Sequence, residues 1–152
     1  RIEFVDRLPN VHPRRQVALG PRTSLDDARQ FVSYHVLTSS LLGTPSEVHV
    51  RGDEVAFVYP HKLVVMQTQG TLFTKEVGSR THVRQFELDG GQAVWITGAP
   101  HFFGYVGASG PPRPINLYLA GNTLLWQRGD LTVRIEGKLT RAQAVAVARS
   151  LR

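Results

Sequence analysis

The sequence predicts an α+β domain, in which a twisted antiparallel meander of roughly seven to nine strands lies between a short N-terminal helix and a C-terminal helix packed on the sheet. Short apolar runs alternate with two-residue turn signals through the middle of the chain, and helix-capping patterns occur near both ends. The 152 residues, 41% hydrophobic and 20% charged, suit one globular domain.

Residues 1–22 are expected to form a lead-in or juxtamembrane linker, and residues 23–152 a single α+β domain. Three prolines, Pro9, Pro13 and Pro21, interrupt the lead-in, although residues 2–5 have the composition of a strand. At the start of the domain Ser24 precedes Asp27 by three residues, which is a variant of the capping box. This pattern predicts a helix over residues 25–32.

The strands are predicted from period-two apolar runs and the turns between them. Hairpins are expected where residues 47–51 and 54–59 flank Gly52-Asp53, and where residues 123–128 and 131–136 flank Gly129-Asp130. A third hairpin joins residues 81–88 to 92–97. Further strands are predicted over residues 63–69, 71–73, 102–106 and 115–120. Turn dihedral angles are expected to explain Gly90, Gly91, Gly121 and Gly129.

The C-terminal helix is predicted over residues 141–151, because Thr140 and Gln143 form a capping box. Its apolar positions, Ala144, Val147, Ala148 and Leu151, have helical spacing and should lie against the sheet.

The charged and polar residues do not form a recognisable catalytic, metal or nucleic-acid motif. The net charge is +6, yet the fifteen arginines are scattered, with Arg14-Arg15 as the one adjacent pair, so no nucleic-acid partner is expected. No cysteine is present, and the six histidines lack metal-ligand spacing, although His49 and His82 lie in predicted strands that could meet. Most aspartates lie at turns and helix starts, at Asp26, Asp27, Asp53, Asp89 and Asp130. We expect no enzyme activity, metal or cofactor.

Aromatic residues concentrate in the later strands and offer the one candidate ligand site. The speculative binding residues are Trp95, His101, Phe102, Phe103 and Trp126. Successive strand residues face opposite sides, so Phe102 and Phe103 cannot enter the same layer. The set is either ordinary core packing or the wall of an apolar groove, with residues 98–101 as a lip of the groove or merely a turn.

A family resemblance rests on several segments of the sequence. They are AGNTLLWQRGDLTVRIEG (residues 120–137), LTRAQA (139–144) and ARSL (148–151), with SLDDA (24–28), LGTPSEV (42–48) and AVWITGAPH (93–101) upstream. Together they resemble the C-terminal extracytoplasmic domain of uncharacterised function found in anti-sigma-factor-like membrane proteins and related lipoproteins of Gram-positive, actinobacterial-type bacteria. That family has no catalytic motif to carry over to this chain.

The resemblance implies a domain outside the membrane, tethered by an anchor upstream of Arg1. Its expected function is that of a non-enzymatic sensor or protein-interaction module, whose partner is a protein or a cell-envelope component. One alternative is a lipoprotein-type carrier that holds an apolar ligand on a curved sheet. An undetected hydrolase is a further alternative, and the sequence does not give the oligomeric state.

Overall fold

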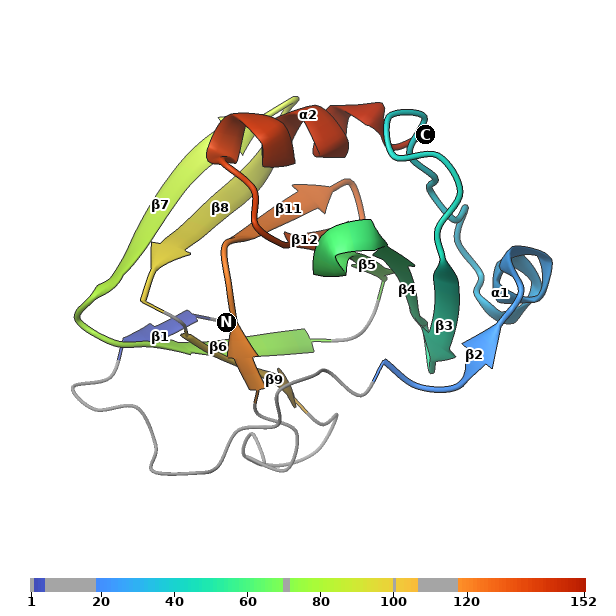
Figure 1. Cartoon of the computed structure of the whole chain (residues 1–152), viewed down its shortest axis with the longest axis horizontal. Helices are drawn as coiled ribbons and strands as arrows, with labels where there is room; N and C mark the ends of the chain where they lie inside the picture. The colour runs from blue at the N-terminus through green and yellow to red at the C-terminus, as the bar shows by residue number, and fades with distance from the viewer. Residues whose placement is uncertain (1, 5–18, 70–71, 100, 107–117) are drawn as a thin grey trace.

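In the computed structural model, residues 2–4, 19–69, 72–99, 101–106 and 118–152 are described, and they form two sheets and two α-helices (Figure 1). The strands of the larger sheet are β2 (Arg22–Thr23), β3 (Glu47–Arg51), β4 (Glu54–Tyr59), β5 (Leu63–Thr68), β7 (Thr81–Leu88), β8 (Gly91–Gly98), β11 (Thr123–Arg128) and β12 (Leu131–Glu136). The smaller sheet contains β1 (Ile2–Phe4), β6 (Leu72–Val77), β9 (His101–Val106) and β10 (Tyr118–Ala120). The helices are α1 (Leu25–Phe31), α2 (Arg141–Ser150) and the short 3₁₀ helix η1 (Pro60–Lys62).

The eight strands of the large sheet are all antiparallel, in the order β2-β3-β4-β5-β12-β11-β8-β7. In Figure 1 the helix α2 covers one face of this sheet, and the small sheet, in the order β1-β6-β9-β10, lies beyond the opposite face. The α+β class, the antiparallel sheet and the two helices confirm the prediction. The small sheet, with its parallel pair β1·β6, was not predicted.

The strand order of the large sheet departs from sequence order at its centre. The hairpin β11–β12 is inserted between β5 and β8, so that Val65 of β5 pairs with Ile135 of β12 and Trp95 of β8 pairs with Leu124 of β11. Within the large sheet this hairpin joins two groups of strands, β2 to β5 and β7 to β8.

Glycine permits most of the tight turns, as the sequence predicted. The residues Gly52, Gly90 and Gly129 have positive φ values of 59°, 81° and 61°. Turn dihedrals do not explain Gly91 or Gly121, neither of which has a positive φ, and that expectation was wrong. At Gly91 the cause is close approach, since an added Cβ would collide with the carbonyl oxygen of Gln127.

The main core lies between α2 and the face of the large sheet that we call the helix face. The buried helix residues Ala144, Val147 and Ala148 pack with sheet residues, and Leu151 follows them at the C-cap. The Thr140 Oγ1 accepts a hydrogen bond from the Gln143 backbone N–H at 3.2 Å, and the Gln143 side chain accepts one from the Thr140 N–H at 2.8 Å. This capping box begins α2 at the predicted residue.

Hydrogen bonds from Gln67 hold the segment after α1 against the helix face of the large sheet. The buried Gln67 amide accepts a hydrogen bond from the Leu37 N–H at 2.7 Å and donates one to the Leu37 carbonyl at 2.9 Å. The Tyr34 hydroxyl lies 2.7 Å from the Gln67 carbonyl oxygen, and burial raises the pKa of this tyrosine. The α1 helix itself is peripheral, because Ala28 is its one buried residue.

Candidate functional site

The two predicted tryptophans belong to the main core. Register pairs Trp95 with Leu124 and Trp126 with Ala93, which places all four side chains on the helix face. The tryptophans are 7% and 4% exposed, and the Trp126 Nε1–H donates to the Leu88 carbonyl at 2.9 Å. Both indoles are therefore held in the core that α2 helps to close.

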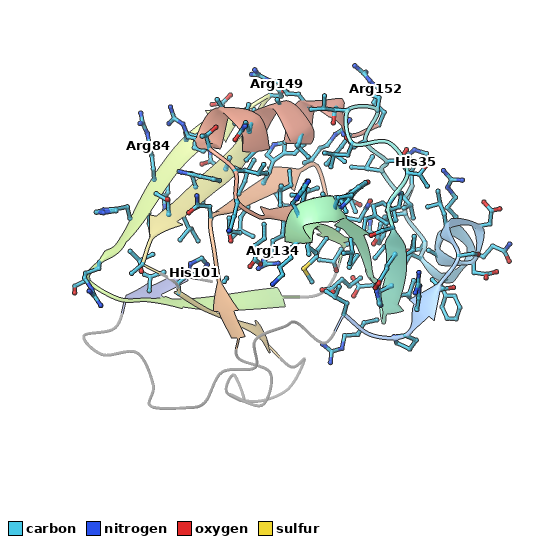
Figure 2. All side chains as sticks on the ribbon, viewed as in Figure 1. His35, Arg84, His101, Arg134, Arg149 and Arg152 are labelled. Carbon is cyan, nitrogen blue, oxygen red and sulfur yellow. The ribbon has the colours of Figure 1, made fainter. Side chains whose placement is uncertain are left out.

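The other predicted ligand-binding residues lie on the small sheet. The side chain of His101 is 1% exposed at the start of β9, and Figure 2 shows it between the two sheets. The side chains of Phe102 and Phe103, which follow in β9, lie outside the described part of the structure. Trp95 and Trp126 occupy the helix face of the other sheet, so the described members of this set do not line one common surface. Their role in ligand binding stays a prediction.

The histidines are dispersed. His49 lies on β3 and His82 on β7, near opposite edges of the large sheet, so these two strands, which could have met, do not pair. Among the described residues, no three His, Asp or Glu side chains form a group that could hold a metal ion. Neither described α-helix has the length and apolar character that crossing a bilayer requires.

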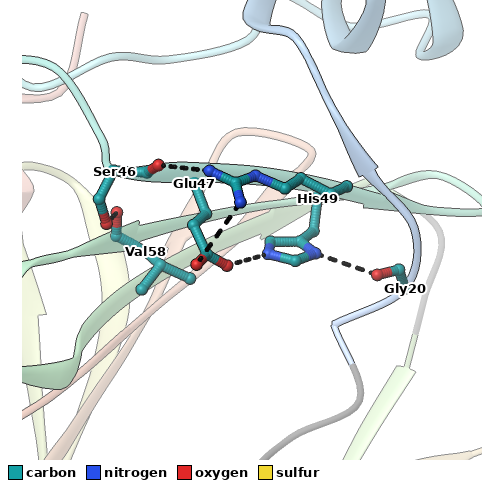
Figure 3. A network of polar contacts seen from close by, with 6 residues as sticks. Gly20, Ser46, Glu47, His49 and Val58 are labelled. Atoms are coloured by element: carbon teal, nitrogen blue, oxygen red, sulfur yellow. Dashed lines mark hydrogen bonds and ion pairs between the residues drawn. The ribbon is translucent and has the colours of Figure 1, made fainter.

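The end of the lead-in is bound tightly to β3. The Val50 N–H donates to the Pro21 carbonyl at 3.1 Å. Arg22 Nη2 donates to the Ser46 carbonyl at 3.2 Å, a bond drawn in Figure 3. At Gly20, which has a φ of 89°, an added Cβ would lie 2.6 Å from the Val50 carbonyl oxygen. Sequence analysis missed this docking, because a glycine before a proline has the same appearance in a free linker.

The side chain of His49 is the centre of this contact (Figure 3). Its Nδ1 lies 3.0 Å from the Gly20 carbonyl oxygen, and its Nε2 lies 2.9 Å from Glu47 Oε2. Both partner atoms are acceptors when Glu47 is ionised, so a doubly protonated ring satisfies both contacts and a neutral ring satisfies one. We call the group Gly20, Arg22, Ser46, Glu47 and His49 the lead-in anchor.

The lead-in anchor gives a pH-dependent prediction for Glu47. The hydrogen bond from His49 is the main cause that lowers the pKa of this carboxyl, and Arg22 adds to the effect. A lowered pKa stabilises the fold above the ordinary carboxyl value, and the contribution disappears as the pH falls through the folded-state pKa. Wild type should therefore be more stable than Glu47→Gln at neutral pH, and the difference should shrink on acidification.

Urea unfolding of both proteins between about pH 7 and about pH 2 measures this difference. The control is the same substitution in a His49→Ala background, where most of the difference should be absent, because its main cause has been removed. A stability difference that stays constant down the pH series would contradict this account.

The strand β7 forms the opposite edge of the large sheet, and among the described residues no strand pairs with its outer side. The Ala99 N–H donates to the Arg80 carbonyl at 3.0 Å, so the backbone of Arg80 faces β8. Because backbone groups alternate along an antiparallel strand, Val83, Gln85 and Glu87 direct their N–H and C=O groups outward. This edge, at the left margin of Figure 1, runs the length of the strand.

Cations gather where β7 meets α2. The guanidinium of Arg141 lies 5.6 Å from the centroid of the Phe86 ring, and the exposed Arg84 lies two residues before Phe86 on the same face of β7. Arg149 of α2 holds Asp89, with Nη2 3.0 Å from Oδ1. Figure 2 shows Arg84 and Arg149 projecting outward from β7 and α2. Asp89 is thus already neutralised by an arginine, and the surface keeps an excess of positive charge.

The other face of the large sheet, which we call the inner face, carries a buried charged side chain. Arg134 is 0% exposed; its Nη1 lies 3.0 Å from the Met66 sulfur, and its Nη2 forms an ion pair with Glu136. Glu136 also accepts a hydrogen bond from the Gly121 N–H at 3.1 Å, at the corner between β10 and β11. Figure 2 shows Arg134 between the two sheets. Its sequence signal is an arginine within an alternating strand, which resembles an exposed position.

Comparisons with protein-family models, with curated proteins and with solved structures found no match to this chain. The proposals for its function therefore rest on the sequence and the structure of this chain.

Proposed function

We propose that the chain is a non-enzymatic extracytoplasmic sensor or protein-interaction module of a membrane-anchored regulatory protein of the anti-sigma-factor-like type. The proposal combines the sequence resemblance with one structural observation, the docking of the lead-in on the large sheet. In a tethered module, the lead-in is the segment that connects the folded domain to its anchor.

The lead-in anchor supports this function because it joins the connecting segment to a folded sheet. Pro21 bonds to Val50 of β3 and Arg22 to Ser46 just before β3, and Gly20 packs against Val50 too closely for any side chain. The same sheet extends through β5, β12 and β8 to the open edge of β7. A partner that binds one arrangement of the sheet more tightly than another would shift the population of arrangements and hence the position of the lead-in.

The test is to read the coding sequence upstream of Arg1 in the source genome. A span of about 20 apolar residues, preceded by a small cytoplasmic helical domain, is the result we expect. A signal peptide that ends at a lipidated cysteine would instead favour the carrier. A soluble catalytic or DNA-binding domain, with no membrane span, would overturn the proposed placement and function.

A further inference from the structure

We propose that the outer edge of β7 binds an extended acidic peptide segment, which adds a strand to the large sheet. This inference deepens the proposed function, because it names the chemistry of the partner that the interaction module would bind. It is carried by two independent features of the same edge, the direction of the backbone groups and the sign of the surrounding charge.

The outward backbone groups of β7 suit the addition of a strand. Val83, Gln85 and Glu87 direct their N–H and C=O groups away from β8, and the strand spans eight residues without proline. Such an edge is a template for an extended peptide, since main-chain hydrogen bonds supply affinity whatever the peptide sequence. The neighbouring side chains then determine which sequence is preferred.

On the helix face, the added strand would lie beside His82, Arg84 and Phe86. Arg84 is exposed, and Arg141 reaches over the Phe86 ring from α2. Carboxylates at alternate positions of the peptide would therefore meet Arg84 and Arg141, which lie along the same side of β7. Asp89, which directly follows β7, is already paired with Arg149.

On the inner face, the neighbours of the added strand are Val83, Gln85 and Glu87. An apolar residue suits Val83, and an acidic residue beside Glu87 would be repelled. The preferred segment thus alternates, with acids toward α2 and uncharged residues on the other side. Alternation of this kind distinguishes strand addition from simple attraction between opposite charges.

The charges also favour an acidic peptide over a second copy of the chain. If two β7 strands paired about Gln85, Arg84 of each copy would lie beside the Phe86 of the other, which Arg141 already covers. Like charges would then approach each other, at a cost in free energy. An anionic membrane would satisfy the arginines, but it offers no alternating donors and acceptors to the outward backbone groups of β7.

The probe is a fluorescent eight-residue peptide of alternating glutamate and valine, titrated with the isolated chain by anisotropy. Its control is a peptide of the same composition with the glutamates in one block. We expect the alternating peptide to bind at least about tenfold more tightly than the block peptide. Equal binding of the two peptides would overturn the proposal.

Two pairs of variants separate charge from strand addition. Arg84→Glu should weaken binding by about tenfold or more, whereas Lys62→Glu, an equal change of charge on η1, should leave it unchanged. Gln85→Pro removes an outward N–H and should abolish binding, whereas Gln85→Ala keeps that N–H and should bind normally. Far-UV circular dichroism confirms that each variant is folded.

The remaining outcomes each overturn the proposal. Binding that survives Gln85→Pro but not Arg84→Glu would show a charged surface without strand addition. A dimer that Gln85→Pro disrupts would make a second copy of the chain the occupant of this edge. Binding of anionic vesicles or of DNA in preference to the peptide would assign the arginines to those partners. Any of these results would leave the upstream membrane span, and so the proposed placement, untouched.

Discussion

Replacing Arg134 with methionine is expected to lower the free energy of unfolding by about 3–5 kcal/mol, the cost of breaking a buried ion pair by removing one partner. The guanidinium is fully buried on the inner face and is paired with Glu136. Methionine keeps much of the length of the side chain. The lost free energy of unfolding therefore comes more from the missing charge than from a new cavity. The Glu136 side chain, 15% exposed, would lose its ion pair with Arg134 while remaining largely out of water.

The control for Arg134→Met is the double variant Arg134→Met with Glu136→Gln, which removes both charges together. Urea unfolding should show that the double variant recovers a substantial part of the lost stability, because the carboxylate that pairs with Arg134 is removed together with it. A single variant within about 0.5 kcal/mol of wild type would show that the buried pair contributes little to the stability of the fold.

Replacing Gly91 with alanine is expected to destabilise the domain by about 1–3 kcal/mol or more, the usual cost of overpacking a well-packed region. The new methyl group would collide with the Gln127 carbonyl oxygen of β11 and lie 3.0 Å from the Trp126 Nε1. Because the first of these contacts is backbone, β8 and β11 would have to separate at this end. The Trp126 indole N–H, which bonds to Leu88, would shift with them.

The matched control is Gly121→Ala, where no atom of the described residues lies within 4 Å of the added methyl group. This variant should unfold within about 0.5 kcal/mol of wild type. Thermal unfolding followed by tryptophan fluorescence measures both effects. Similar melting temperatures for the two variants would show that the strands accommodate the methyl group at Gly91.

Local signals in the sequence predicted the elements of this fold well. The Ser24 and Thr140 caps begin the two α-helices where the structure has them, and the glycines of the turns define the hairpins. Each of these signals acts within a few residues of the feature it determines. Of the strand predicted over residues 115–120, residues 118–120 form β10, and residues 115–117 lie outside the described part.

The second sheet could not be predicted, because it depends on contacts between distant segments. In β12, apolar Leu131, Val133 and Ile135 alternate with Thr132 and Arg134, which is the pattern of a strand with one face in water. The structure buries the Arg134 side on the inner face instead. Alternation tells which residues share a face, but it does not tell what covers that face.

The candidate site was predictable only in part, for the same reason. Trp95 and Trp126 lie in the predicted strands 92–97 and 123–128, and the structure pairs those two strands directly. Whether the two indoles formed a groove or a core depended on the position of α2. The lead-in anchor was not foreseen, because it requires His49 to meet Gly20 across a gap in the sequence.

The central position of the hairpin β11–β12 has a consequence for the order of folding. Thr68 of β5 pairs with Thr132 of β12, so the middle of the large sheet closes a long loop of chain, and folds rich in such distant contacts form slowly. During synthesis, β5 and β8 are made before the hairpin that joins them. Until residues 123–136 have emerged from the ribosome or the translocon, these two strands expose unpaired edges, and the chain is at that stage most vulnerable to aggregation and proteolysis.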